Sequence, residues 1–117
     1  MIEQLGALQQ LAVNSASEKK AFDILMLDLR NRSDLTDFFM ICSGNSKVHV
    51  QSIVDAICDN CCPTHKKPLA IEGYSGGNWV VLDLGDLIAH VFHKEARLQY
   101  DLERLWGDVP VIKAVGQ

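Results

Sequence analysis

One stretch, residues 79–106 with the sequence WVVLDLGDLIAHVFHKEARLQYDLERLW, constrains the fold more than any other. Its first part alternates with a period of two, which is typical of a strand. Gly85 and Asp86 then suit a two-residue turn of type II′ or I′, after which a second alternating strand returns. The pattern predicts a β-hairpin. One face of the first strand carries Trp79, Val81 and Asp83, and one face of the second carries Ile88, His90 and Phe92.

The period changes at Lys94, where the alternation gives way to helical spacing. Leu98, Leu102 and either Leu105 or Trp106 recur at the intervals of a helical stripe, and Gly107 is well placed to end the helix. The stretch therefore reads as strand, turn, strand and helix.

The rest of the chain adds two helices and three strands. An amphipathic helix is predicted around residues 2–12, followed by a polar break at residues 15–20. AFDILMLDL and DFFMICSG read as strands with apolar residues on both faces, which is the pattern of inner strands covered by helices. Ser46 is a plausible N-cap for the helix KVHVQSIVDAICDNCC. Its apolar stripe comprises Val50, Ile53, Val54, Ile57, Cys58 and Cys61.

LAIEG is a short further strand, so the element order predicts an α/β fold with a five-stranded mixed sheet packed with helices. A chain of 117 residues suffices for one domain and one core. We assign residues 1–107 to this domain and residues 108–117 to a C-terminal tail that is too short to place and is expected to fray.

Net charge and hydropathy exclude some classes of function. The net charge of -4 argues against a general binder of nucleic-acid backbones and favours a basic partner. No apolar run approaches the roughly 20 residues that span a bilayer. The N-terminus lacks a basic leader and a cleavage pattern, so we expect a cytoplasmic protein that does not bind membranes.

Cysteine clustering raises the question of a metal site. Cys58, Cys61 and Cys62 lie within five residues, and His65 follows them. A structural zinc site usually recruits a second ligand pair from elsewhere in the chain, and none is evident. We therefore favour buried or reduced thiols over a metal site or a disulfide, and we expect no metal and no cofactor.

The sequence gives only weak support for a catalytic site. Ser43-Gly44-Asn45-Ser46 resembles the glycine-serine entry to a helix that some nucleotidyltransferases use, although capping alone explains such residues. Asp28, Asp83 and Asp86 could hold divalent ions only if they converged. His90 and His93 fall on opposite faces of their strand, so they cannot share one metal without a bulge.

A binding surface has better physical support than a catalytic site. Trp79 begins a strand beside a glycine-rich turn, and an exposed Trp in such a place is usually covered by a binding partner. The neighbouring acids suit a basic partner: Glu72, Asp83, Asp86, Glu95, Asp101 and Glu103. The alternative, that Trp79 caps the core and the acids are solvated, is equally compatible with the pattern.

A family resemblance adds to this reading. The blocks LTDFFMICSGNS, IEG, WVVLDLGDLIAHVFHKEAR and YDLERLW together resemble the ribosomal silencing factors, or Iojap-like proteins, over roughly residues 5–107. The resemblance implies a nucleotidyltransferase-like topology without an established catalytic role. It also implies binding to the large ribosomal subunit through its ribosomal protein fourteen. The bound factor would then block association with the small subunit and silence translation under nutrient limitation or in stationary phase.

The resemblance also implies site residues. The partner-facing surface maps onto the hairpin, with Trp79 as an aromatic anchor and Val81 and Asp83 on its face. Tyr74, Asp86, Ile88 and His90 are expected to extend this surface, and Glu95 or Arg97 to edge it. Another set is expected to hold the last helix on the sheet: Leu98, Tyr100, Leu102, Leu105 and Trp106.

The sequence is also compatible with two other functions. One is a nucleotidyltransferase-like enzyme that acts on a nucleotide or transfer RNA. The other is a homodimer that uses the hairpin or the first helix against a second copy, since an apolar surface that binds a partner can also self-associate. Sequence-specific nucleic-acid binding is not expected.

Overall fold

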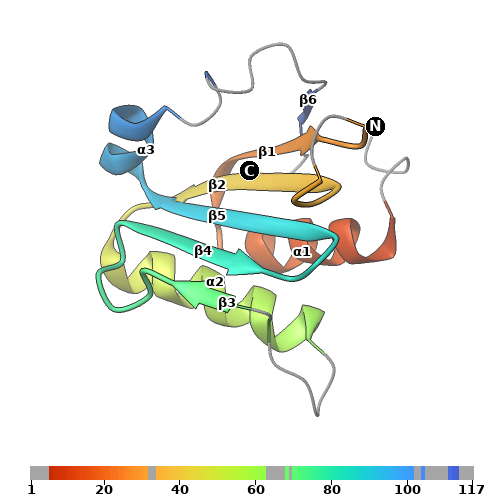
Figure 1. Ribbon diagram of the computed structural model, residues 1–117. Coiled ribbons are helices and arrows are strands. Elements are labelled where there is room, and N and C mark those ends of the chain that lie inside the picture. Colours follow the sequence, from red (N-terminus) through yellow and green to blue (C-terminus); the bar gives the residue numbers. More distant parts are fainter. Residues whose placement is uncertain are drawn as a thin grey trace.

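The computed structural model describes residues 6–31, 34–62, 68, 70–101, 104 and 111–113. Its centre is a mixed sheet of six strands in the order β3-β4-β5-β2-β1-β6 (Figure 1). The bounds are β1 Phe22–Asp28, β2 Phe38–Gly44, β3 Ala70–Glu72, β4 Trp79–Asp83, β5 Leu87–His93 and β6 Val111–Lys113. Among these described strands only β2 and β5 pair in parallel, and their other neighbouring pairs are antiparallel. The prediction of an α/β fold with a mixed sheet is confirmed.

The strand count differs from the prediction because of the C-terminal tail. Val111, Ile112 and Lys113 form β6, which pairs with Leu27, Met26 and Leu25 of β1. The five expected strands are present, and this short edge strand adds a sixth. A three-residue strand carries too little periodicity to be recognised alone, and here the exposed edge of β1 provides its pairing partner.

Two helices cover one face of the sheet. The helices α1 (Ala7–Glu18) and α2 (Lys47–Cys61) lie side by side on it (Figure 1). The predicted N-cap of α2 is confirmed, because the Ser46 hydroxyl accepts a hydrogen bond from the His49 backbone N–H at 3.1 Å. The predicted stripe of α2 is also confirmed. Val50, Ile53, Val54 and Ile57 are buried, and Cys58 and Cys61 pack against the same cluster.

The first helix extends further than predicted. Residues 15–18 continue α1 instead of breaking it. Ser15 is buried, and its hydroxyl donates to the Leu11 carbonyl oxygen at 2.7 Å and accepts from the Asn60 side chain at 2.8 Å. These bonds satisfy a polar group inside the helix, so a polar sequence can stay helical there. The predicted helical residues Ile2 and Leu5 lie outside the described residues.

The last helix, α3 (Lys94–Tyr100), packs with a different side from the predicted one. Leu98 is 83% exposed and Tyr100 is 48% exposed, whereas Ala96 and Arg97 are buried. The prediction that Leu98 holds this helix on the sheet is therefore wrong. The helix begins directly after β5, so the path of that strand decides which side faces inward. Leu102, Leu105, Trp106 and Gly107 lie outside the described residues.

Within the part of the chain that the structure describes, none of the helices has the length and apolar character needed to cross a membrane.

Candidate partner-binding face

Strand register brings the two halves of the hairpin onto one face. Across β4 and β5, Trp79 pairs with Phe92, Val81 with His90, and Asp83 with Ile88. Because paired residues point to the same side of a sheet, these six side chains share a surface, which we call the hairpin face. The opposite side, where Val80 and Leu82 are fully buried beneath the helices, is the helix-covered face.

Trp79 packs into an aromatic group on the hairpin face. Its ring stacks on Phe92 at a centroid distance of 5.1 Å and lies 4.7 Å from the ring of Tyr100, which α3 supplies. Trp79 nevertheless stays partly exposed. The ring is therefore packed on the sheet and still reaches the surface, an arrangement that is compatible with both sequence interpretations of Trp79.

His90 lies beneath this aromatic group and holds the indole ring. It is 6% exposed, and its Nδ1 accepts a hydrogen bond from Trp79 Nε1 at 3.0 Å. The Phe39 ring contacts the imidazole edge to face at 4.6 Å. Burial lowers the pKa of His90 to about 4, so the ring is neutral near neutral pH and Nδ1 keeps the lone pair that the bond requires. His90 is therefore a packed residue of the sheet.

Val81, Ile88 and Asp83 complete the hairpin face at different depths. Val81 is partly buried and packs against the buried apolar residues on this side of the sheet. Ile88 is 5% exposed, so it mainly supports its neighbours from below. Asp83 is partly exposed, and one carboxylate oxygen accepts from the Gly85 backbone N–H at 2.9 Å. Val81 and Asp83 therefore reach the surface beside Trp79.

The hairpin turn places Asp86 at the exposed end of this face. Gly85 has φ +93°, whereas Asp86 has no positive φ, which fits the type II′ alternative and excludes type I′. Asp86 is solvent exposed. The turn adds a second carboxylate close to Asp83 in the chain.

Tyr74 lies elsewhere, contrary to expectation. Its ring packs against the helix-covered cluster, and its hydroxyl donates to the Asp55 carboxylate of α2 at 2.9 Å. The Gln51 side chain donates to the Tyr74 carbonyl oxygen at 2.8 Å. The bond to Asp55 raises the pKa of the Tyr74 phenol. These contacts with α2 draw the loop before β4 away from the hairpin face.

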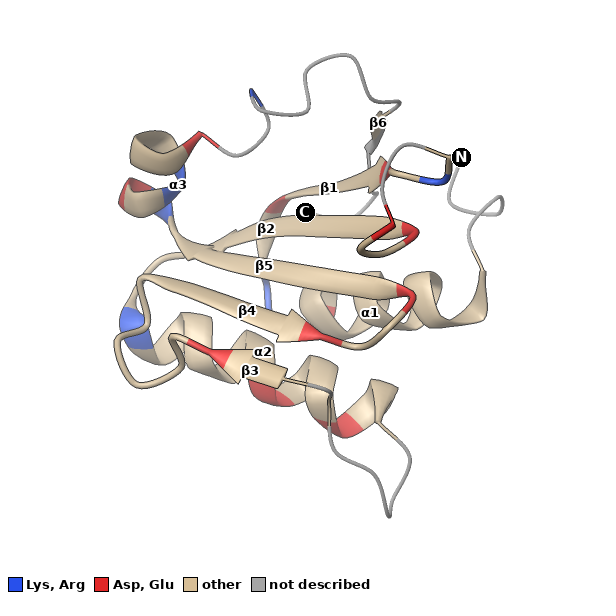
Figure 2. Cartoon of the chain, in the orientation of Figure 1, with Lys and Arg blue, Asp and Glu red and all other residues tan. Residues whose placement is uncertain are grey.

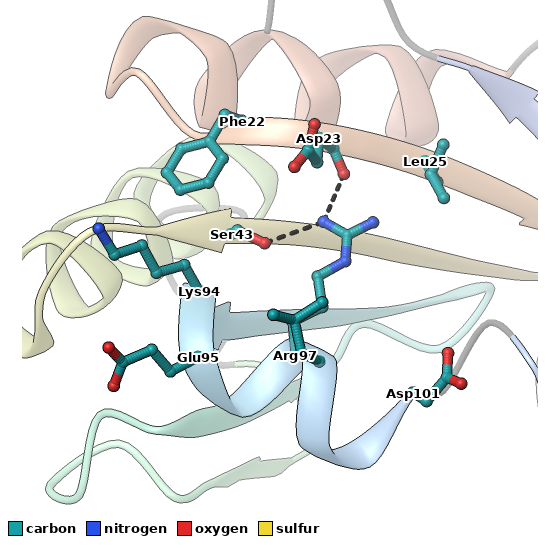
Figure 3. Close-up of a pocket in the computed structure, with 9 residues that line it drawn as sticks. Phe22, Asp23, Leu25, Ser43, Lys94, Glu95, Arg97 and Asp101 are labelled. Atoms are coloured by element: carbon teal, nitrogen blue, oxygen red, sulfur yellow. Dashed lines mark hydrogen bonds between the residues drawn. The ribbon is translucent and has the colours of Figure 1, made fainter.

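Arg97 is a structural residue whose importance the sequence did not reveal. Its guanidinium is buried and donates to the Asp23 carbonyl oxygen at 2.6 Å and to the Ser43 hydroxyl at 2.9 Å (Figure 3). Asp23 has φ +52° at a register shift in β1, where the ladder is interrupted. Arg97 thus joins α3 to the bulge and to β2. The family resemblance implied a place for Arg97 only at the edge of the partner surface.

A cavity of about 730 Å³ lies beside this arginine, between α3 and the strands β1 and β2. Figure 3 shows Lys94 and Glu95 on α3 and Asp23 on β1 around it. Ser43 connects the cavity with the hairpin face, because Ser43 pairs with Phe92 across β2 and β5. The cavity therefore flanks α3 next to the aromatic group.

The carboxylates of the enzyme alternative do not converge. Asp83 lies on the same side of the sheet as Leu27, because the register pairs Asp83 with Ile88, Ile88 with Phe39 and Phe39 with Leu27. Asp28 follows Leu27 in β1 and therefore points to the opposite side of the sheet. Asp28 instead forms a salt bridge with Arg30 at 2.7 Å. The residues 43–46 lie at the other end of the sheet from the β4–β5 turn. Among the described residues no three His, Cys, Asp or Glu side chains gather as a metal site.

The cysteines are free thiols, as the sequence analysis favoured. Cys42 is fully buried, and burial raises the pKa of its thiol to about 12. Cys58 and Cys62 face each other at the end of α2 with 3.9 Å between their sulfur atoms. Burial raises the pKa of Cys61 and of Cys62 to about 11, so all three of these shifted thiols are protonated at neutral pH.

Fold and surface together define a class of protein: an α/β domain with α1 and α2 on one side of its sheet and, on the other, a partly exposed aromatic group that α3 flanks. Comparison with known proteins gives the family. Residues 3–117 match the family model described as "Ribosomal silencing factor during starvation". The chain belongs to the ribosomal silencing factor family, whose members associate with ribosomes and regulate translation, as the resemblance implied.

Individual relatives match this chain over most of their length. The chain is 42% identical to ribosomal silencing factor RsfS of Halalkalibacterium halodurans, with 93% of each chain covered. It is 41% identical to the Bacillus subtilis protein of that name, covering 90% of this chain and 89% of the relative. A crystal structure of a Bacillus halodurans protein matches with a TM-score of 0.79 and 40% identity, covering 92% of this chain and 97% of that one.

Proposed function

We propose that this protein binds the large ribosomal subunit through ribosomal protein fourteen, using the hairpin face, and thereby blocks association with the small subunit. The observation that carries the proposal is Trp79, a large ring that is packed on a rigid sheet and still partly exposed. Trp residues of this kind are enriched among the side chains that dominate binding energy at interfaces. Membership of the family supports ribosome association.

Charge supports a basic partner surface. The register of β3 and β4 pairs Glu72 with Val81, which places Glu72 on the hairpin face at its outer edge. Asp83 follows Val81 on β4, and Asp86 lies at the turn. Figure 2 shows acidic segments on β3, at the end of β4 and at this turn. A basic protein surface would meet complementary charge around a largely uncharged centre formed by Trp79 and Val81.

The proposed mechanism needs no chemical step. The domain measures 36 × 34 × 26 Å, and its hairpin face is rigidly connected to the helix-covered core through shared strands. If the hairpin face docks on one subunit, the rest of the domain projects toward the approaching subunit and occupies its space. Repression then depends on binding affinity and on where the site lies.

The first test is sedimentation of purified subunits with the wild-type protein and with Trp79→Ala. Truncation should weaken binding to the large subunit by about 2 kcal/mol or more, which corresponds to roughly a 30-fold loss of affinity. Joined ribosomes should therefore reappear at protein concentrations at which the wild type prevents joining. Val48→Ala is the matched control, because Val48 is 73% exposed on α2, away from the hairpin face.

Each outcome of this experiment separates the alternatives. Failure of the wild type to sediment with the large subunit would refute the proposal, and divalent-metal-dependent nucleotide binding would then favour the enzyme alternative. Equal binding by folded Trp79→Ala would remove the hairpin face as the binding site. Light scattering of the free protein tests the homodimer alternative.

A second test concerns the acidic edge. Charge reversal by Asp83→Lys or Asp86→Lys should slow association with the large subunit and reduce its dependence on salt, since attraction to a basic surface is lost. The measurement is the association rate across a salt series. Asp59→Lys on α2 makes the same charge change outside the hairpin face. Parallel salt slopes for all the variants would contradict an acidic docking surface.

A further inference from the structure

We infer that the partner covers Trp79 with an arginine or lysine side chain, whose stem packs on the indole and whose charge reaches the neighbouring carboxylates, and that the indole N–H makes no bond to the partner. The inference rests on the proposed function and deepens it. It follows from the direction in which the indole is held. His90 makes this inference possible, because it accepts the hydrogen bond from the only side-chain donor of Trp79.

The first step concerns the indole nitrogen. An indole has one polar atom, Nε1, which can only donate a hydrogen bond. In this protein Nε1 donates to His90 Nδ1 at 3.0 Å, within the sheet. A partner acceptor could capture the N–H only by breaking this bond. That exchange would leave Nδ1 of a 6% exposed histidine without its donor.

The state of the imidazole keeps the bond in place. Since Nδ1 accepts, the proton of neutral His90 lies on Nε2, which is buried and has no hydrogen-bond partner among the described residues. The imidazole ring lies near the rings of Phe39 and Phe92, at centroid distances of 4.6 and 6.4 Å. Burial also lowers the pKa of His90, which favours the accepting form. The imidazole therefore has one strong bond, and that bond fixes the indole.

The second step concerns what remains at the surface. With Nε1 turned inward, the exposed part of Trp79 consists of carbon atoms. A carboxylate or carbonyl oxygen placed there would lose hydration without gaining a hydrogen bond. An aliphatic stem or a guanidinium plane loses nothing comparable and can gain a contact with the π system.

The third step selects a cation over a purely aliphatic group. Val81 follows Trp79 on the same face, and it is flanked by Glu72 from β3 and by Asp83 on its own strand. A long basic side chain can lie along the indole and Val81 while its charge reaches one of these carboxylates. A leucine or isoleucine would leave both carboxylates without a counter-charge.

Variants at the two bonded positions test the first half of the inference. Trp79→Phe retains a ring but removes the N–H, and it should weaken binding by only about fivefold, against roughly 30-fold for Trp79→Ala. His90→Leu should weaken binding because the freed indole loses its fixed orientation. His90→Asn, which offers an oxygen near the position of Nδ1, should restore most of the affinity. A Trp79→Phe loss as large as that of Trp79→Ala would overturn the inference.

A spectroscopic readout separates orientation from loss of folding. In ¹⁵N-labelled protein, the Trp79 indole N–H signal should be slow to exchange with solvent and should keep its hydrogen-bonded shift when isolated ribosomal protein fourteen is added. His90→Leu should abolish the protection while the backbone signals of β4 and β5 persist. A large shift of the indole signal on binding, with loss of the bond to His90, would show that the partner takes the N–H.

Double-mutant cycles identify the partner side chain. Each exposed Arg and Lys of ribosomal protein fourteen is changed to Ala and combined with Trp79→Ala and with Asp83→Asn. One basic position should couple to both, by at least about threefold in affinity, whereas the others should be additive. Additivity at every basic position would refute a cation on Trp79. If the wild-type complex did not form, the proposed function itself would fail, and the two failures are thus distinguishable.

Discussion

The two faces of this sheet are built from different side chains. The helix-covered face is mainly aliphatic, with Phe38 as its buried aromatic residue. On it α1 and α2 place residues such as Val13, Ile53 and Ile57 against strands whose facing side chains are buried. The hairpin face carries aromatic rings, a buried histidine and a Trp that remains partly exposed. Aliphatic side chains and helices cover the helix-covered face. On the hairpin face, stacking and a hydrogen bond fix the positions of the rings but leave Trp79 partly exposed.

This difference separates stability from binding. Aliphatic groups fill space in the core, and most of their free energy comes from removal from water. Rings with a polar atom can be oriented as well as buried, because the indole N–H of Trp79 donates to Nδ1 of His90 at the base of the surface. Substitutions on the helix-covered face should therefore reduce the free energy of unfolding, and exposed substitutions on the hairpin face should chiefly reduce binding.

The largest expected effect is on the helix-covered face. Ile53→Ala should lower the free energy of unfolding by about 3 kcal/mol, because Ile53 is fully buried between α2 and the sheet and the change leaves a cavity. Val81→Ala, on the partly exposed hairpin face, should cost only about 1 kcal/mol. Urea unfolding measures both. Equal losses would erase the distinction between the faces.

The next effect comes from pH and involves the hairpin face. The pKa of His90 falls from its ordinary 6.5 to about 4 on folding. Between these values the unfolded chain binds more protons, so stability falls as the pH drops through this window and levels off below it. The full loss from this residue is roughly 3 kcal/mol at most. Urea unfolding of the wild type and of His90→Asn over this range should differ in slope, and identical pH profiles would count against a buried neutral imidazole.

The smallest effect concerns the start of α2. Ser46→Ala removes the side chain that accepts from the His49 N–H and should cost about 1 kcal/mol of stability. Affinity for the large subunit should be unchanged, because Ser46 belongs to the helix that covers the opposite face. Parallel unfolding and binding measurements provide the comparison. A loss of affinity without a loss of stability would place part of the binding surface at this end of the domain.

Local pattern was sufficient for most elements. Alternation predicts β4 and β5, Gly85 predicts their turn, and the stripe from Val50 to Ile57 predicts α2 and its inward side. It was insufficient where an element was short or where a polar group found a distant partner. Ser15 stays inside α1 with the help of Asn60, and β6 exists only because β1 offers an edge.

The sequence by itself determined the α/β class, the hairpin and its alternation, the helical cap at Ser46 and the family. These follow from periods of two and of 3.6 residues and from local hydrogen bonds, which are properties of neighbouring residues. Only the tertiary structure decided that Trp79 donates to His90, that Tyr74 turns to Asp55 and that Arg97 rather than Leu98 faces inward. Each of these depends on contacts between separate elements, and such contacts are set by packing in three dimensions.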